Sequence, residues 1–92
     1  MDHSDYFEEG MEEKAKNFEQ MLKSGESFFY DNDELSRLID YYLDFDQLKN
    51  ASHAIAFGEE LFPFESYYQI KKAELYIAQR NINSAIKLLE KY

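Results

Sequence analysis

The sequence has no cysteine, so neither a disulfide framework nor a thiolate site can form, as fits a reducing compartment. It also lacks long apolar runs. Residues 1–23 contain nothing typical of a secretory signal, and no stretch approaches the roughly 18 apolar residues that a membrane span needs. We therefore expect a cytoplasmic protein that has no membrane partner.

Basic residues are few, and the shortage is concentrated at one end. The net charge is −9, and residues 1–34 alone, with 11 acidic residues and 3 lysines, contribute −8. An acidic chain repels phosphate groups, so we expect neither nucleic acid nor anionic lipid as a partner. The acidic segment is typical of a solvated helix face, and the alternative is a surface that steers a basic partner.

Proline and glycine are also scarce, with one and three residues, and this favours helices because both residue types interrupt them. Apolar residues four, four, three and four positions apart predict a first helix over about residues 4–23. These residues are Phe7, Met11, Ala15, Phe18 and Leu22. Gly25 follows at a position where glycine commonly ends a helix.

The same spacing predicts four further helices, over about residues 32–45, 47–61, 66–79 and from 82 to the last residue. Pro63 ends the third of the five predicted helices. No segment alternates convincingly between apolar and polar residues, so no sheet is expected. The predicted fold class is all-α, with about five helices in a single domain of 92 residues.

The stretch SFFYDNDEL, residues 27–35, predicts how the second helix begins. Asp31 and Glu34 have the spacing of a capping box, in which each side chain accepts a hydrogen bond from the other residue's backbone. Tyr30 and Leu35 have the spacing of a hydrophobic staple across that cap. Two aromatic residues before the cap are expected to pack the connector onto the first two helices: Phe28 and Phe29.

Residues 31–34 are acidic enough to suggest a calcium loop as well. Such a loop alternates its ligands and needs glycine at its sixth position, whereas the alternation here breaks at once and the sixth residue is Ser36. We therefore expect a helix cap and no metal. A second capping box, Ser66 with Gln69, is predicted at the start of the fourth helix.

The chain matches itself when it is shifted so that Ile39 falls on Ala73, and we call this shift one repeat. The other matching pairs are Tyr42 with Tyr76, Leu43 with Ile77, Leu48 with Ile82, Ala51 with Ala85, Ala54 with Leu88 and Ile55 with Leu89. The shift equals the tetratricopeptide period, a helix–turn–helix unit of about 34 residues. Two antiparallel helices cannot bury their apolar faces alone, so such units stack on one another. Within each unit, we expect the small Ala51 and Ala85 to let the paired helices approach closely.

Two segments resemble tetratricopeptide repeats. LSRLIDYYLDFDQLKNASHAIAFGEELFP, residues 35–63, resembles one unit with its closing proline, and QIKKAELYIAQRNINSAIKLLEKY, residues 69–92, resembles a shortened second unit. The inter-helix glycine is missing from both, and Gly58 stands where alanine is usual. The resemblance implies a short right-handed solenoid with a leading helix at 4–23 and repeats at 32–65 and 66–92. The acidic leader is similar to those of bacterial members.

In this family the first helix of each unit lines a concave groove that often binds peptides. The resemblance implies these groove residues: Arg37, Asp40, Asp44, Tyr67, Ile70, Lys71 and Glu74. Chaperone-binding members hold a terminal carboxylate with lysine and asparagine, and the matching positions here are Ser36 and Asp40. That carboxylate clamp is therefore not expected, and Arg37 and Lys71 have the spacing for ion pairs within or between helices.

No glycine-rich phosphate loop, nucleophile elbow or zincin pattern occurs in the sequence. We therefore predict a protein that is not an enzyme, has no cofactor, and binds a protein or peptide in its groove. The alternative is an assembly segment, whose last helix would pack against further repeats or form a weak homodimer. The residues expected to mediate that contact are Ile86, Leu89 and Tyr92.

Overall fold

Helices account for most of the residues that the computed structural model describes, which are 3–25 and 30–91. The helices in these ranges are α1 (His3–Ser24), α2 (Asn32–Asp44), α3 (Leu48–Leu61), α4 (Tyr67–Ala78) and α5 (Ile82–Leu89). No strand occurs there, so the all-α class is confirmed. The expected continuation of α5 to the last residue is wrong, because the N–H of Lys91 bonds to the carbonyl of Leu88 in a tightened final turn.

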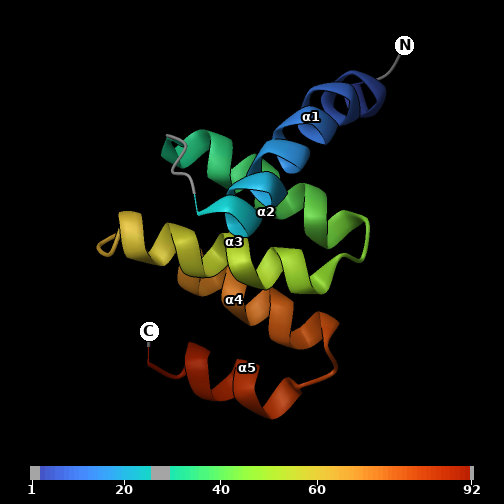
Figure 1. Ribbon diagram of the computed structural model, residues 1–92. Helices are drawn as coiled ribbons and strands as arrows, with labels where there is room; N and C mark the ends of the chain where they lie inside the picture. Colours follow the sequence, from blue (N-terminus) through green and yellow to red (C-terminus); the bar gives the residue numbers. More distant parts are fainter. Residues whose placement is uncertain (1–2, 26–29, 92) are drawn as a thin grey trace.

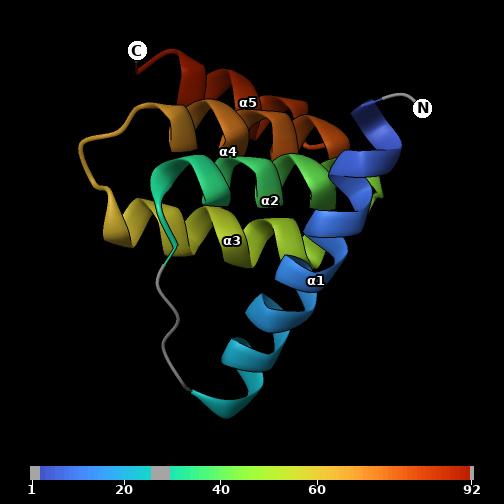
Figure 2. The ribbon, with the colours of Figure 1, turned by 90° about the horizontal axis from the view of Figure 1, so that it is seen from above.

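The helices follow one another in space as they do in sequence. α1 packs on α2, α2 on α3, α3 on α4 and α4 on α5, and α2 also contacts α4. Figure 2 shows α2, α3, α4 and α5 running side by side, with α1 crossing them obliquely. α1 and α5 therefore lie at opposite ends of the stack (Figure 1).

The buried face of α1 differs from the expected one near its C-terminal end. Met11, Ala15 and Phe18 are buried as expected, but Leu22 is exposed and Met21 is buried in its place. Because α1 crosses the other helices obliquely, the face that it buries rotates along its length, which a fixed spacing does not predict. Phe7 lies outside the described side chains.

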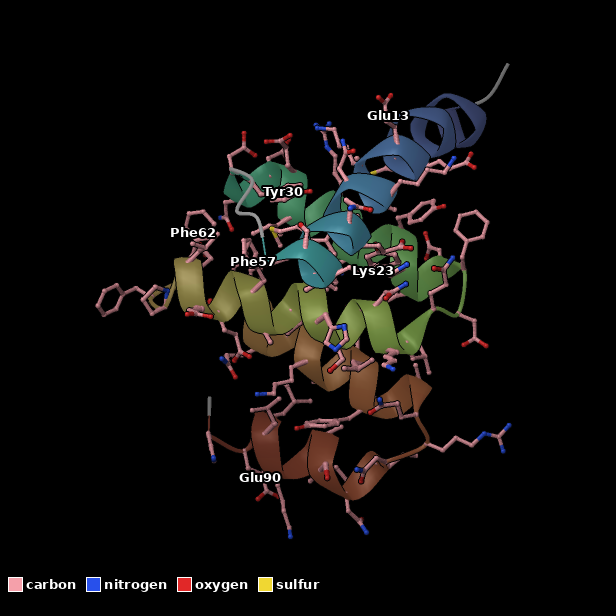
Figure 3. The ribbon with its side chains drawn as sticks, viewed as in Figure 1. Glu13, Lys23, Tyr30, Phe57, Phe62 and Glu90 are labelled. Atoms are coloured by element: carbon pink, nitrogen blue, oxygen red, sulfur yellow. The ribbon has the colours of Figure 1, made fainter. Side chains whose placement is uncertain are left out.

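An aromatic cluster closes the space between α1 and α3. The rings of Tyr30 and Phe57 meet edge to face with centroids 6.0 Å apart, and both contact the ring of Phe18 in the same manner. Figure 3 shows Tyr30 and Phe57 pointing toward one another. Tyr30 and Leu35 belong to the same buried cluster, as the expected staple requires. The contacts expected of Phe28 and Phe29 lie outside the described residues.

The predicted capping box at the start of α2 is confirmed. The N–H of Glu34 donates to Oδ1 of Asp31 at 2.7 Å, and the N–H of Asp31 donates to Oε1 of Glu34 at 3.3 Å. The second predicted box is wrong, because Ser66 has helical φ and ψ angles and its side chain caps nothing. A capping side chain works from an extended backbone, and Gln69 donates instead to Glu59 of α3.

The turns after α2 and α4 lie one repeat apart and have the same hydrogen bonds. Asp46 N–H donates to Leu43 O and Gln47 N–H to Tyr42 O, which together form a Schellman motif. After α4, Arg80 N–H donates to Ile77 O and Asn81 N–H to Tyr76 O. Asp46 and Arg80 take the left-handed conformation, with φ of 58° and 62°, at the position where glycine is usual. The repeat is therefore a backbone repeat, and non-glycine residues adopt its strained position.

Tyr68 joins the two helix pairs. A Cβ atom at Gly58 of α3 would come within 2.1 Å of Cε1 of Tyr68, so only glycine leaves room for the ring. The ring stacks on Phe62 with centroids 6.3 Å apart, and the hydroxyl donates to Oδ1 of Asn32 at 2.5 Å. These contacts connect the N-terminal end of α4 to both α2 and α3, and they explain why position 58 is a glycine.

Candidate protein-interaction surfaces

A polar cluster lies where α4 crosses α2. Nζ of Lys71 is 2.6 Å from Oδ1 of Asp40 and 3.1 Å from Oε2 of Glu74, and it lies 5.4 Å from the centre of the Tyr67 ring. The Tyr67 hydroxyl donates to the carbonyl of Ser36 at 3.3 Å. Four of the expected groove residues are therefore brought together: Asp40, Tyr67, Lys71 and Glu74.

The electrostatics of this cluster depend on Lys71, whose side chain is only 14% exposed. Burial alone would lower the pKa of its ammonium group, but hydrogen bonds to Asp40 and Glu74 outweigh burial and hold that pKa above the ordinary value. Burial and the charge of Asp40 raise the pKa of Tyr67. Lys71 is thus charged and already paired with two carboxylates, so it is poorly placed to receive a carboxylate from a ligand.

The other expected groove residues do not join the cluster. Arg37 forms an exposed ion pair with Asp33 at 2.8 Å, one turn away on its own helix. Asp44 is exposed near the C-terminal end of α2. Ile70 is exposed on a different side of α4 from Lys71, because adjacent helical residues are about 100° apart.

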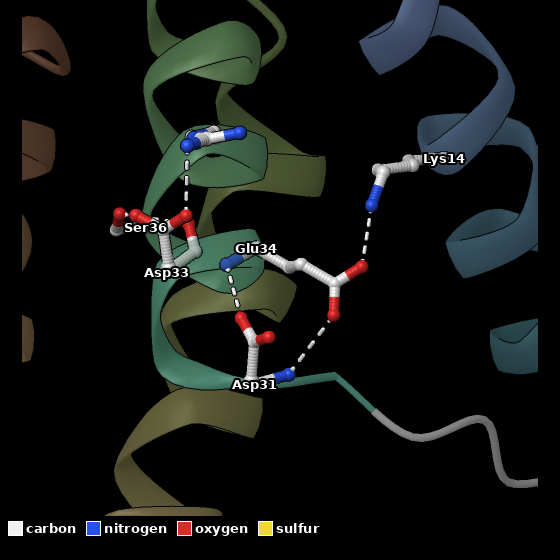
Figure 4. A network of polar contacts seen from close by, with 6 residues as sticks. Lys14, Asp31, Asp33, Glu34 and Ser36 are labelled. Atoms are coloured by element: carbon white, nitrogen blue, oxygen red, sulfur yellow. Dashed lines mark hydrogen bonds and ion pairs between the residues drawn. The ribbon is translucent and has the colours of Figure 1, made fainter.

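A second polar network ties α1 to the start of α2 (Figure 4). Nζ of Lys14 donates to Oε2 of Glu34, whose other oxygen accepts the N–H of Asp31. These hydrogen bonds, Lys14 first, hold the pKa of the Glu34 carboxyl below its ordinary value. Within 3–25 and 30–91 no three acidic or histidine side chains gather as metal ligands would. Asp31 and Glu34 form the helix cap, and Glu34 also forms the ion pair with Lys14.

An apolar surface covers one side of α4 and α5. Of nine large apolar side chains that are exposed in the described part of the chain, five lie on these two helices, each between 48% and 57% exposed. They are Ile70 and Ile77 of α4 and Ile82, Ile86 and Leu89 of α5. We call these five residues the open face.

Helix geometry places both rows of the open face on one side of the α4–α5 pair. Ala85 is the buried residue of α5, and Ala73 is buried on α4 outside the core shared with α2 and α3, so these alanines mark where the two helices meet. Ile70 and Ile77 flank Ala73 by one turn each. Ile82, Ile86 and Leu89 recur at spacings of four and three, so they form a row along one side of α5. Because α5 runs antiparallel to α4, this row and the row of Ile70 and Ile77 line the same shallow depression between the two helices, which we call the valley.

Comparison of the chain with protein-family models, with curated proteins and with solved structures finds no match. In the described part of the chain, no helix is long and apolar enough to cross a bilayer. Inference about function therefore rests on the surfaces described above.

Sequence reasoning missed part of the open face. It expected Ile86 and Leu89 at an exposed end, and their role in association stays a prediction, while Tyr92 lies outside the described residues. Ile77 and Ile82 were not expected to join them, and Ile70 was assigned to the groove. The four-and-three spacing of the exposed residues of α5 can be recognised in the sequence. That they lie beside the exposed isoleucines of α4 follows only from how the two helices pack.

Proposed function

We propose that this chain is a non-catalytic protein-interaction module, built as a short right-handed tetratricopeptide-like solenoid that contacts its partner through the open face. The solenoid is supported by turn hydrogen bonds and left-handed residues that recur one repeat apart. Stacking of successive helices, with α2 reaching α4, is also typical of such repeats. A bacterial, cytoplasmic setting belongs to the proposal and is supported by composition and by the acidic leader.

The open face is the observation that carries this proposal. Exposed apolar side chains occur singly on most protein surfaces, whereas contiguous groups of them usually mark a contact site. The residue of the first pair that corresponds to Leu89 is Ile55, which is buried in the core together with Tyr68 and Leu75 of α4. The second pair therefore presents the same kind of surface that the first pair uses to hold a helix.

The groove side of α2 and α4 is a second candidate surface, supported by its charge. Asp40 and Glu74 remain 44% and 48% exposed although both contact Lys71, and Asp44 is exposed nearby. One cation among these carboxylates leaves an acidic surface. Such a groove would suit a basic segment, and it opposes the terminal carboxylate that chaperone-binding members hold.

The assembly alternative places further repeats or a second copy on the open face, and a second copy would bring the same patch from both partners together. Analytical ultracentrifugation over a concentration series separates the two readings. An interaction module for another protein should sediment as a monomer, as should Leu89→Glu. A dimer that Leu89→Glu dissociates would favour assembly over partner binding.

Site-specific photo-crosslinking in cells tests the interaction module. A photoreactive phenylalanine analogue is placed at Ile86 on the open face, at Asp44 on the groove side and, as a control, at the exposed Ala56 of α3. We expect discrete crosslinked proteins from position 86, and their loss when Leu89→Asp is added. Crosslinked proteins from position 44 alone would mean that the groove, and not the open face, binds the partner. Equal crosslinking yields at all three positions would contradict a specific binding surface.

A further inference from the structure

We infer that the open face takes an amphipathic α-helix that carries an aromatic residue and, four residues after it, a lysine or arginine. This inference rests on the proposed function and specifies the chemistry of the partner. It follows from the way in which the first helix pair of this chain already holds a helix.

The interface of α4 with α2 supplies the template. α4 presents Tyr67, whose hydroxyl donates to the carbonyl of Ser36, and four residues later Lys71, whose ammonium group contacts Asp40 at 2.6 Å. Tyr68 and Leu75 of α4 are buried in the same core cluster as Ile55 of α3. An aromatic residue and a lysine four positions apart therefore lie on one face of the docked helix.

Shifted by one repeat, each of these acceptor positions falls on the second pair. Ser36 corresponds to Ile70, Asp40 to Glu74, and Ile55 to Leu89. Glu74 keeps the carboxylate of Asp40, and Leu89 keeps the aliphatic side chain of Ile55. Ile55 is 2% exposed in the core that it shares with α4, whereas Leu89 is 48% exposed. The second pair thus repeats the acceptor surface of the first pair without the helix that covers it.

Charge selects a partner over a second copy as the occupant. Glu74 adjoins the α4 row, and Glu90 directly follows Leu89 at the end of α5 (Figure 3). A second copy would offer either its own open face, with the same two carboxylates, or the outer surface of α1, which belongs to the strongly acidic segment 1–34. Both choices oppose like charges, whereas a helix with a basic residue at the proper spacing pairs with Glu74.

A synthetic peptide with the sequence of residues 66–80, SYYQIKKAELYIAQR, is the probe, because it contains the helix that the first pair holds. It is titrated into the full chain labelled with ¹³C at isoleucine methyl groups. Four of the six isoleucines lie on the open face, and Ile39 and Ile55 are buried in the core. We expect saturable shifts for the four surface isoleucines and none for the two buried ones. A shift of Ile55 would mean that the peptide displaces the chain's own α4, and would overturn the inference.

Charge reversal makes the test specific. The peptide with glutamate in place of its first lysine should bind about tenfold more weakly, a loss of about 1.4 kcal/mol. The chain variant Glu74→Lys should likewise lose affinity for the parent peptide and regain it for the reversed peptide. Gln79→Lys, at an exposed position beyond the rows of the open face, is the matched control and should leave affinity unchanged.

Three further outcomes would overturn the inference. The first is that the surface isoleucine methyl groups show no saturable shift at millimolar peptide. The proposed function would still stand in that case if the photo-crosslinking experiment captured discrete proteins at position 86. The second is that neither charge reversal changes the affinity, which would show that the lysine of the peptide does not contribute to recognition. Surface-isoleucine shifts that depend on chain concentration without peptide would make a second copy the occupant.

Discussion

The helix pairs α2–α3 and α4–α5 have the same backbone pattern and different surroundings. Their turns carry the same Schellman hydrogen bonds and a left-handed residue at the same position. Yet Ile55 is buried and its counterpart Leu89 is exposed, and Tyr42 is fully buried while Tyr76 is only partly so. The repeat thus determines local backbone geometry, whereas burial depends on which helix lies next to each unit.

α1 makes the first pair different on its other side as well. The hydroxyl of Tyr42 donates to the carbonyl of Ala15 at 3.2 Å and to a carboxylate oxygen of Glu19 at 2.9 Å. The first pair is therefore covered by α1 on one side and by α4 on the other. The second pair has α3 and α2 as neighbours on one side and presents the open face on the other.

The largest expected difference between the pairs is in the cost of truncating the matched aliphatic residues. Ile55→Ala should lower the free energy of unfolding by about 2–5 kcal/mol, because it leaves a cavity in the buried core. Leu89→Ala should change it by about 0.5 kcal/mol or less, because the side chain is half exposed in the free chain. Urea denaturation followed by circular dichroism at 222 nm measures both, and equal losses would mean that the open face is covered in solution.

Much of the fold is predictable from the sequence because its signals are local. Helix positions follow from the three-and-four spacing, and the cap of α2 follows from two side chains three residues apart. Apart from the early end of α5, the predictions that failed are those in which a second helix determines the outcome. Met21 replaces Leu22 because α1 crosses obliquely, and Gln69 serves α3 rather than a cap because Glu59 is within reach.

The candidate surfaces were predictable to different degrees for the same reason. Spacing alone brings Lys71 within reach of Glu74, whereas its approach to Asp40 depends on how α4 packs on α2. The assignment of Ile70 to the groove stays a prediction, because the resemblance orders positions along a helix but does not say which of its sides stays uncovered. The valley that Ile70 shares with Leu89 requires the packed arrangement of α4 and α5.

The next effect concerns the contact between the two pairs. Gly58→Ala should destabilise the chain by about 1–3 kcal/mol, because the new methyl group would overlap the ring of Tyr68. Gly10→Ala in α1 is the matched control. It meets nothing within 4 Å, so it should stabilise the helix by about 0.5–1 kcal/mol. Combining Gly58→Ala with Tyr68→Ala should cost less than the sum of the single changes, and strict additivity would contradict the overlap.

Alkaline titration should reveal the two fully buried tyrosines of the core, Tyr42 and Tyr68. Burial is the main cause that raises the pKa of Tyr42 above its ordinary value, and it raises the pKa of Tyr68 to about 12. Between about pH 10 and pH 12 the unfolded chain releases protons that the folded chain keeps, so the free energy of unfolding falls as the pH rises.

The measurement follows tyrosinate absorbance at 295 nm together with helicity at 222 nm. Tyr42→Phe should flatten the pH dependence and cost about 0.5–1.5 kcal/mol at neutral pH through its lost hydrogen bonds. If Tyr42 ionised near pH 10 in the folded chain, its burial beneath α1 would be disproved.

The smallest effect should be the same in both pairs, and it tests the feature that they share. Asp46 and Arg80 are held at positive φ, where a side chain costs about 1–2 kcal/mol and glycine costs little beyond its own chain entropy. Asp46→Gly and Arg80→Gly should therefore each stabilise the chain, by about 0.5–1 kcal/mol after that entropy is subtracted. Gln79→Gly, one residue before Arg80 at negative φ, is the control and should give no gain. Thermal unfolding of the three variants decides the point. A gain at only one of the two turns would show that the Schellman motif is relaxed in the other pair, and the backbone equivalence of the pairs would then fail where it is most direct.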